Sequence, residues 1–457
     1  MPILLFIAMT QQSLLLVAWY FPPDGGAGSQ RPCSFARHLP DLGWKTTVLT
    51  RGKDHPRSRL STRDDSLLAD IGPRAQIRRI DETGPIVDAT GGFEREITST
   101  AGPFYRALCD CAADQSPDII LISMSPFSFS NAIPSIRSSS SSRIVIDLRD
   151  PWALDYWPLF RSEVRQDQMR LMIETFKQVD GVLMNTEEAR HEVLSMLGPH
   201  LPSDFSQRIS VVQNGYSAAD FSGESPVADD RLRITHAGTF LCELLKSRRT
   251  IKQRIGDRLK RRSRGKIDRT GRTPYYLLQA AGILKRTDPD IYHALRFEFI
   301  GHDDDHLRAC VNQSPCPEKV DVIGYLPHAE MIKRIQSAPA LFLPCGQLDD
   351  SVRELIVPGK TYEYLASCRP ILAALHPGDA LDLITASGGG YPCKPTCSNS
   401  IASSLRTLHR DWLSGELNDL RDQRSEFLEH FERGRLAEKL SDFLHKTMSS
   451  PRVGGCG

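Results

Sequence analysis

The chain lacks the features that mark several specialised classes of protein. Its 57 Lys and Arg residues balance its 56 Asp and Glu residues, and a net charge of +1 gives no general attraction to nucleic acid or another polyanion. Its eleven cysteines form no C-x-x-C pair and no Cys/His spacing of a zinc site, which predicts reduced thiols in a cytosolic protein. Neither a G-x-x-x-x-G-K-[ST] phosphate loop nor a G-x-G-x-x-G dinucleotide motif is present.

Long apolar runs are missing too. No stretch reaches the roughly 20 apolar residues that a membrane-spanning helix needs. The apolar start, residues 1–9, has neither the basic region nor the small-residue cleavage site of a signal peptide. We interpret it as an upstream extension, with Met9 as a later candidate start; a signal or anchor is the alternative.

What the chain does have is two series of short apolar runs. The first series comprises residues 14–21, 45–50, 118–123, 143–148, 181–185 and 208–213, and the second comprises 231–238, 295–301, 319–326, 340–345 and 369–375. Segments with helical periodicity separate most of them. Buried strands of a parallel sheet have this pattern, so a chain of 457 residues is predicted to form two doubly wound, Rossmann-like α/β domains that face a cleft.

The expected domain limits follow from the polar segments. The first domain takes residues 13–222 and the second takes 231–425, joined by the polar linker 223–230. Residues 426–447 carry leucines at helical spacing, which predicts an amphipathic helix docked on a domain. The tail 448–457 is expected to be disordered.

A glycine-rich turn follows the first predicted strand. Gly25, Gly26 and Gly28 stand between that strand and an amphipathic segment. Glycines there let a ligand approach the backbone, and the start of a helix offers free N–H groups to an anion. The turn therefore indicates a phosphate or sugar loop, with a tight turn that binds nothing as the alternative.

An ordered series of motifs resembles the family 4 glycosyltransferases, which are retaining enzymes of GT-B fold. The opening "YFPPDGGAGSQRPCSFARHLPDLGWKTTVLT" is similar to theirs. "VIDLRDPWA" resembles the D-x-R-D-x-W of one subset, and "VPGKTYEYLASCRPILA" matches that subset's P-x-K-x-x-E-Y-L-A motif. "VVQNGYSAADF" is similar to the interdomain segment, and the resemblance spans residues 13–445.

The resemblance implies a function. The protein would transfer a hexosyl-type sugar, with retention, from a nucleotide-diphosphate sugar to a carbohydrate or lipid-linked acceptor, in cell-envelope or exopolysaccharide synthesis. It would need no cofactor and no metal ion, because Arg and Lys neutralise the leaving diphosphate. A nucleotide-sugar epimerase of the same fold, or a non-catalytic nucleotide-sugar-binding protein, is the alternative.

The resemblance also assigns residues on the donor side. Glu363 would bind the ribose hydroxyls and Lys360 the diphosphate, while Arg272 would be the second phosphate-binding cation. Lys246, Arg248 and Arg249 are rivals for the role of Arg272. Further substrate-binding residues by resemblance are Asn214, Gly238 and Thr239.

Arg149 and Asp150 would hold the sugar or orient the acceptor. The family usually carries two glutamates spaced E-x7-E, but here the first position is Leu355. Glu354, one residue earlier, is the candidate to contact the sugar, and Asp349 or Asp350 is the alternative. His236 and His302 lie at strand ends, where structural roles are favoured. "HDDDH" at 302–306 is expected to be a solvated acidic turn rather than a metal site.

The most unusual segment is a basic insertion, residues 246–271. With its neighbour Arg272 it has 13 Lys and Arg against two Asp, and Ile251, Ile255 and Leu259 among its few apolar residues stand at helical spacing. A solvated loop is the favoured interpretation. The alternative is a basic amphipathic helix that docks on an anionic membrane, which would place a cytoplasmic protein peripherally on the inner face. Without interleaved aromatics it does not indicate nucleic-acid binding.

Overall fold

The computed structural model describes residues 11–25, 27–53, 63–69, 71–81, 103–158, 162–222, 230–246, 267–415 and 420–454. Residues 1–10, most of the linker and residues 247–266 of the basic insertion lie outside this range. The two interpretations of the insertion, and of the apolar start, therefore stay predictions. No helix in the described ranges is both long and apolar enough to cross a bilayer.

The first domain is built on a seven-stranded parallel sheet with the order β3-β2-β1-β4-β5-β6-β7. The strands are β1 (Gln12–Ala18), β2 (Trp44–Arg51), β3 (Gln76–Ile80), β4 (Ile119–Ser123), β5 (Arg143–Leu148), β6 (Gly181–Met184) and β7 (Ile209–Val211). The helices are α1 (Ala27–His38), α2 (Ser66–Ala69), α4 (Pro103–Gln115), α5 (Ile133–Ser139), α6 (Ser162–Gln178), α7 (Glu187–Leu197) and α8 (Phe205–Arg208).

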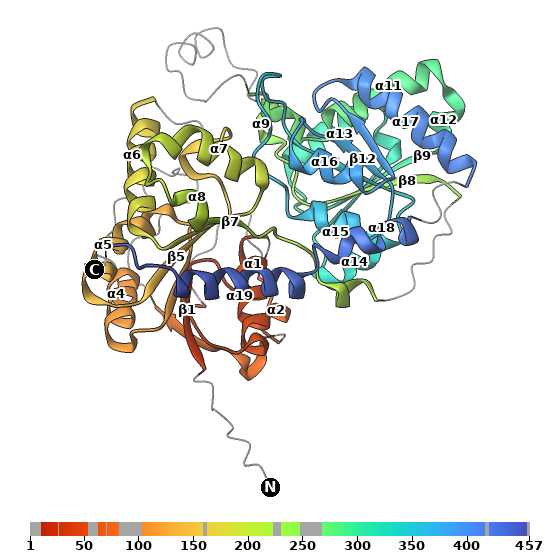
Figure 1. Ribbon diagram of the computed structural model, residues 1–457. Helices are drawn as coiled ribbons and strands as arrows, with labels where there is room; N and C mark the ends of the chain where they lie inside the picture. The colour runs from red at the N-terminus through yellow and green to blue at the C-terminus, as the bar shows by residue number, and fades with distance from the viewer. Residues whose placement is uncertain are drawn as a thin grey trace.

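The second domain has a six-stranded parallel sheet with the order β10-β9-β8-β11-β12-β13. Its strands are β8 (Leu232–Ala237), β9 (Leu295–Ile300), β10 (Val320–Gly324), β11 (Ala340–Pro344), β12 (Ile371–Ala374) and β13 (Gly390–Cys393). The helices of its part of the chain are α9 (Glu243–Lys246), α11 (Tyr275–Thr287), α12 (Pro289–Ala294), α13 (Asp305–Asn312), α14 (His328–Gln336), α15 (Lys360–Ala366), α16 (Asp379–Ala386), α17 (Ser398–Leu413) and α18 (Arg421–Glu429). Figure 1 shows the two domains side by side.

Two doubly wound α/β sheets are thus confirmed. Each sheet reverses its strand order once, between β1 and β4 in the first domain and between β8 and β11 in the second. Ligands of such sheets bind outside the carboxyl ends of the strands at these switch points. The edge strands β3 and β13 were absent from the predicted strand series, whereas the edge strands β7 and β10 were in it.

A buried ion pair ties the first domain together. The Arg31 guanidinium of α1 donates to both carboxylate oxygens of Asp147 on β5, the shortest contact being 2.7 Å. The same guanidinium donates to the backbone oxygens of Val212, at 2.7 Å, and Gln213, at 2.9 Å. One side chain therefore fixes the first helix, a central strand and the start of the interdomain connection.

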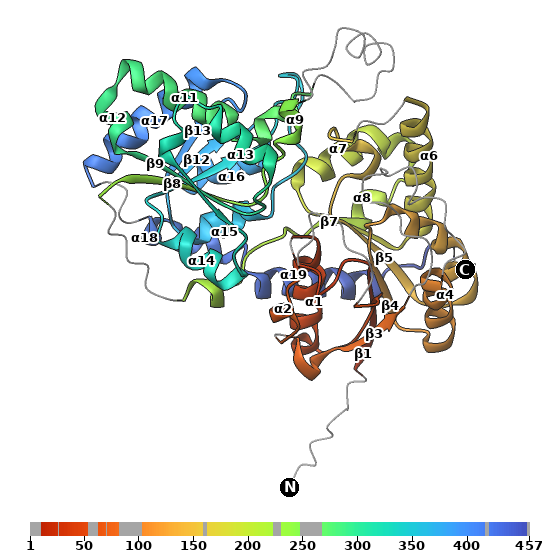
Figure 2. The ribbon, with the colours of Figure 1, turned by 180° about the vertical axis from the view of Figure 1, so that it is seen from behind.

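The last helix, α19 (Arg433–Ser449), returns to the first domain and packs beside α1 (Figures 1 and 2). Leu440 and Leu444 are fully buried in the same apolar cluster as Trp44. The Trp44 indole donates to Ser441 Oγ at 2.9 Å. Where one helix was expected over 426–447, the structure has two, because the chain turns between α18 and α19.

The tail 448–457 was expected to be disordered, and for residues 448–454 this prediction is wrong. The Val453 amide donates to Asp180 Oδ1 at 2.8 Å, and Arg143 donates to the Ser450 oxygen at 2.5 Å. These polar contacts hold the tail against the first domain, although its sequence has no apolar pattern. Residues 455–457 lie outside the described range.

Because α19 completes the core of the first domain, Leu440→Ala is expected to destabilise that domain by about 2–5 kcal/mol. Urea unfolding followed by circular dichroism measures the change. Asp442→Ala, on the exposed face of the same helix, is the matched control and is expected to leave the midpoint unchanged. Equal midpoints for both variants would contradict the assignment of α19 to the core.

Candidate active site

The predicted site residues gather on the loops at the carboxyl ends of the strands. On the first domain these are the loop between β1 and α1 and the segment after β5. On the second domain they are the residues after β8 and β11 and the start of α15. Both sets of loops flank the two switch points, so the topology places the candidate residues where a ligand between the domains is expected.

On the first domain the structure brings Gly28 and Arg149 together. The Arg149 guanidinium donates to the Gly28 oxygen at 2.5 Å, and a Cβ at position 28 would lie 2.9 Å from the same nitrogen. Gly28 is therefore needed to make room for Arg149, which also lies over the Tyr20 ring at 5.6 Å. Asp150 follows, half-buried. Gly25 is half-buried, and Gly26 lies outside the described residues.

On the second domain Lys360 sits at the start of α15. Its ammonium lies 3.5 Å from His236 Nε2, and a Cβ on Gly238 would approach it to 2.0 Å. Burial and, after it, the nearby Arg272 guanidinium lower the pKa of Lys360 to about 8, against an opposing effect of Glu363. Two cations therefore act on each other here, and a bound anion would stabilise the charged form of Lys360.

Arg272 ends the 3-10 helix Arg269–Arg272, just before α11, and is exposed. Its position beside Lys360 agrees with the predicted pairing of the two cations. Of its rivals, Arg248 and Arg249 lie outside the described residues, and Lys246 is described only as the last residue of α9. Thr239 is exposed next to Gly238.

Glu363 lies in the first turn of α15, as expected from the sequence, and is 8% exposed. Among the described residues, none donates a hydrogen bond to the Glu363 carboxylate. Its negative charge raises the pKa of Lys360. A carboxylate in this state can accept hydrogen bonds from two vicinal hydroxyls. Its geometry is therefore compatible with the predicted ribose contact.

His236 has no room to act as a base. It is 1% exposed, its Nδ1 lies 2.9 Å from the Phe342 oxygen, and its ring stacks on Phe240 at 4.1 Å. Burial, then the Lys360 charge, lower its pKa well below the usual range, so the ring is neutral. It packs beneath the lysine as a neutral, fixed support.

Packing explains why the first glutamate of the E-x7-E pattern is replaced by Leu355, with Glu354 one residue earlier. Leu355, where the family pattern has the first glutamate, is 2% exposed and packs into the apolar core. Its backbone oxygen accepts a hydrogen bond from Thr186 Oγ1 of the first domain at 2.7 Å. Glu354 consequently points the other way, into the interface between the domains.

There Glu354 meets residues that the sequence did not single out, Asp155 and Trp157. Glu354 Oε2 accepts from the Trp157 indole at 2.8 Å, and Oε1 accepts from the Ile356 amide at 3.2 Å. Burial raises the pKa of Glu354 to about 7, and the Asp155 charge adds to it. Burial likewise raises the pKa of Asp155 to about 7, with a contribution from Asp150. The available signal was the acid- and aromatic-rich stretch "DPWALDYWP" directly after β5.

Most of the remaining candidates lie outside the helices and strands. Asn214 is half-buried in the interdomain connection, and Asp349 caps its own turn by accepting from the Ser351 amide at 3.2 Å. In the acidic stretch 302–306, Asp304 caps α13 by accepting from the Leu307 amide at 2.8 Å. Among the described residues, no three His, Cys, Asp or Glu side chains converge as metal ligands.

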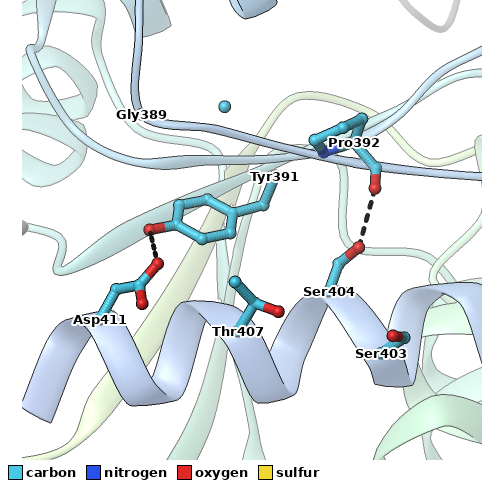
Figure 3. A pocket seen from close by; sticks show the side chains of 8 residues that line it. Gly389, Tyr391, Pro392, Ser403, Ser404, Thr407 and Asp411 are labelled. Atoms are coloured by element: carbon cyan, nitrogen blue, oxygen red, sulfur yellow. Dashed lines mark hydrogen bonds between the residues drawn. The ribbon is translucent and has the colours of Figure 1, made fainter.

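Hollows also lie elsewhere on the surface. One of about 360 Å³ lies between α17 and the amino end of β13, away from the strand ends that carry the candidate residues. In Figure 3, Tyr391 donates to Asp411 and Ser404 donates to the Pro392 oxygen, and Ser403 and Thr407 also line the hollow. It therefore offers no unpaired charge to a ligand.

Comparisons with known proteins bear on the family and the fold. Residues 32–219 match the family model of Glycosyltransferase Family 4. A search of curated proteins finds no significant match. Sucrose-phosphate synthase from Thermosynechococcus elongatus is similar in structure, with a TM-score of 0.66, 14% identity, and coverage of 96% of this chain and 100% of that one.

Two further solved structures have the same architecture. One is a trehalose-6-phosphate synthase studied for glycosyl transfer with retention (TM-score 0.59, 11% identity, 95% of this chain and 99% of that one). The other is a putative UDP-N-acetylglucosamine 2-epimerase from Listeria monocytogenes (TM-score 0.56, 11% identity, 98% and 99%). Together they show that the chain has the GT-B fold.

The raised pKa of Glu354 predicts how stability depends on pH. In the unfolded chain this carboxyl titrates near 4.5, but in the fold it keeps its proton up to about pH 7. Its contribution to stability is therefore complete below pH 4.5 and is lost as the pH rises to 7, with a slope of at most about 1.4 kcal/mol per pH unit.

Glu354→Gln cannot ionise and should flatten the fall in melting temperature between pH 5 and pH 7.5. Scanning calorimetry across this range measures the difference from the wild type. Glu330→Gln, which alters an exposed carboxylate on α14, is the control and should follow the wild-type curve. Parallel curves for all three proteins would argue against a buried, protonated Glu354.

Proposed function

We propose that the protein is a retaining glycosyltransferase that moves a hexosyl-type sugar from a nucleotide-diphosphate sugar to a hydroxyl of a carbohydrate or lipid-linked acceptor. The observation that carries the proposal is the arrangement of Lys360 and Arg272 at the β8/β11 switch point, with the open carboxylate of Glu363 in the same helical turn as Lys360. A diphosphate and a ribose need such groups side by side.

The roles of the groups follow from where charge develops. When the glycosidic bond to the diphosphate breaks, negative charge accumulates on the leaving phosphate, and Lys360 and Arg272 stabilise it. These two cations take the place of a divalent ion, so we propose a reaction independent of metal. Glu363 holds the ribose and so fixes the diphosphate relative to both cations.

His236, beside Lys360, is not suited to remove the acceptor proton, because it is buried. We therefore propose that the leaving phosphate oxygen takes this proton on the same face of the sugar, which gives retention. The protein contributes position and charge stabilisation. Glu354 and the Arg149–Asp150 pair would orient the sugar and the acceptor hydroxyl between the domains.

A nucleotide-sugar epimerase is the second candidate. The observation that favours it is the carboxyl pair of Asp155 and Glu354, since both have pKa values near 7 and could exchange protons with a sugar. The presence of a putative epimerase among proteins of the same fold is compatible with it. The two functions differ in product, because an epimerase changes the donor sugar without an acceptor.

The function is tested by a screen of nucleotide sugars, first by thermal shift and then by turnover in excess chelator. A donor that binds the folded state raises its melting temperature by mass action. We expect one nucleoside base to be preferred and transfer to a carbohydrate acceptor to persist without divalent ions, with the anomeric configuration retained by NMR. An altered sugar released without acceptor would establish the epimerase, and binding without either reaction would leave a binding protein.

Replacement of Glu363 tests the ribose contact. Glu363→Ala is expected to weaken binding of the preferred nucleotide by about 1–3 kcal/mol, the range for removing a charged hydrogen-bond partner. Isothermal titration calorimetry measures the loss, and the exposed Glu330→Ala serves as control. Unchanged affinity in a folded Glu363→Ala protein rules out the proposed contact.

A further inference from the structure

The loop after β5 reaches across to the second domain through one aromatic side chain. Trp157 is 7% exposed and packs against Gly346, where a Cβ would lie only 2.2 Å from the indole ring. The Arg272 guanidinium lies 6.0 Å from the centre of that ring. The indole therefore occupies a space on the second domain that a larger residue at position 346 would close.

The loop that presents Trp157 is held firmly by its own domain. Arg165 of α6 donates to the backbone oxygens of Ala153, at 2.6 Å, and Asp155, at 2.8 Å. It also donates to the Pro158 oxygen, at 2.9 Å. The Trp157 amide itself donates to Asp155 Oδ1 at 2.9 Å. The position of the indole is thus set by the first domain.

The second domain fixes the backbone of Glu354 but not the direction of its carboxylate. Its amide donates to the Pro377 oxygen at 2.7 Å, and Gly378 packs so closely that a Cβ there would lie 2.5 Å from the Glu354 oxygen. These contacts fix the backbone, while its carboxylate takes one hydrogen bond from its own domain, from Ile356, and one from Trp157 across the interface. The direction of the carboxylate therefore depends on both domains.

From this geometry we infer that Trp157 is a positioning residue, which orients the Glu354 carboxylate toward the donor sugar only when the two domains are closed on each other. The inference rests on the proposed glycosyltransferase function. It separates two parts of donor recognition. The nucleotide is bound by the second domain alone, through Lys360, Arg272 and Glu363, whereas the sugar is aligned by a group that the first domain completes.

The test compares Trp157→Phe, Trp157→His and Trp44→Phe in the full chain. Trp157→Phe keeps an aromatic ring against Gly346 but has no N–H donor, whereas Trp157→His retains a ring N–H. Trp44→Phe is the matched control, because it also removes a buried indole hydrogen bond, to Ser441, on the side of the first domain covered by α19. Calorimetry gives the affinity for the nucleoside diphosphate of the preferred donor, and steady-state kinetics give kcat and KM for that donor.

Trp157→Phe is expected to lower kcat by about 10-fold to 100-fold, the equivalent of one charged hydrogen bond, with little change in nucleoside diphosphate affinity. Trp157→His should recover part of kcat, and Trp44→Phe should resemble the wild type. Combined with Glu354→Gln, Trp157→Phe should cause little further loss, because both changes act on one interaction.

Several results would overturn the inference while leaving the proposed function intact. They are wild-type kinetics in Trp157→Phe, an equal loss of nucleoside diphosphate affinity and turnover, no recovery in Trp157→His, or full additivity with Glu354→Gln. If Trp157→Phe fails to fold, kcat of Trp157→His is compared with that of the wild type instead. If Trp157 served only to stabilise the fold, the folded Trp157→His protein would have the wild-type kcat. A wild-type protein without any transfer would instead refute the proposed function itself.

Discussion

The buried guanidinium of Arg31 is the constraint on which the first domain, and through it the interdomain geometry, depends. Arg31 is 2% exposed and Asp147 is fully buried, so neither charge has water to replace a lost partner. Breaking such a pair by removing one side costs on the order of 3–5 kcal/mol. The pair matters for the site because Asp147 lies two residues before Arg149, and because Arg31 also binds the backbone where the chain leaves β7 for the second domain. A shift of α1 would therefore displace both the loop after β5 and the interdomain connection.

How much of this could be predicted from sequence depended on burial. Central strands of a parallel sheet are apolar on both faces, and β1, β4 and β5 were predicted with only small errors at their ends. Two of the four edge strands, β3 and β13, were missed: "QIRRI" of β3 is partly exposed along its length, and "GYPC" of β13 is short and contains Pro392, whereas the edge strands β7 and β10 were predicted. Single sequence patterns do not record which strand has a neighbour on one side only. The ordered tail failed for a related reason, since its contacts are backbone and side-chain hydrogen bonds to distant residues.

Some residues of the candidate site could also be predicted from the sequence, and others could not. Lys360 and Glu363 were predictable because both belong to one local motif at the start of one helix, where spacing alone places them on one turn. The partnership of Glu354 with Trp157 was not, because it joins positions 197 residues apart on different domains. Its cause is the burial of Leu355, which assigns the neighbouring position to the interface, and no local pattern reports which of two adjacent side chains enters a core. Gly28 shows the converse case, a glycine recognised from sequence as a ligand loop whose observed role is to admit the Arg149 guanidinium.

The electrostatics of the site make sense as a state prepared for a ligand. After burial, the Arg272 charge lowers the pKa of Lys360, and the Asp155 charge raises the pKa of Glu354, each toward the neutral form. The charges of the two cations and the two carboxyls do not neutralise each other, because the cations lie near the start of α15 and the carboxyls lie in the domain interface. The charge of Arg272 acts on both Lys360 and the carboxyls. A diphosphate would offset the repulsion between the two cations and raise the pKa of Lys360 again, and sugar hydroxyls would add hydrogen bonds to the two carboxyls. A nucleotide sugar combines both groups in one molecule, at opposite ends of the bond to be broken. The same ligand would therefore relieve both repulsions at once, which a free nucleotide or a free sugar could not do.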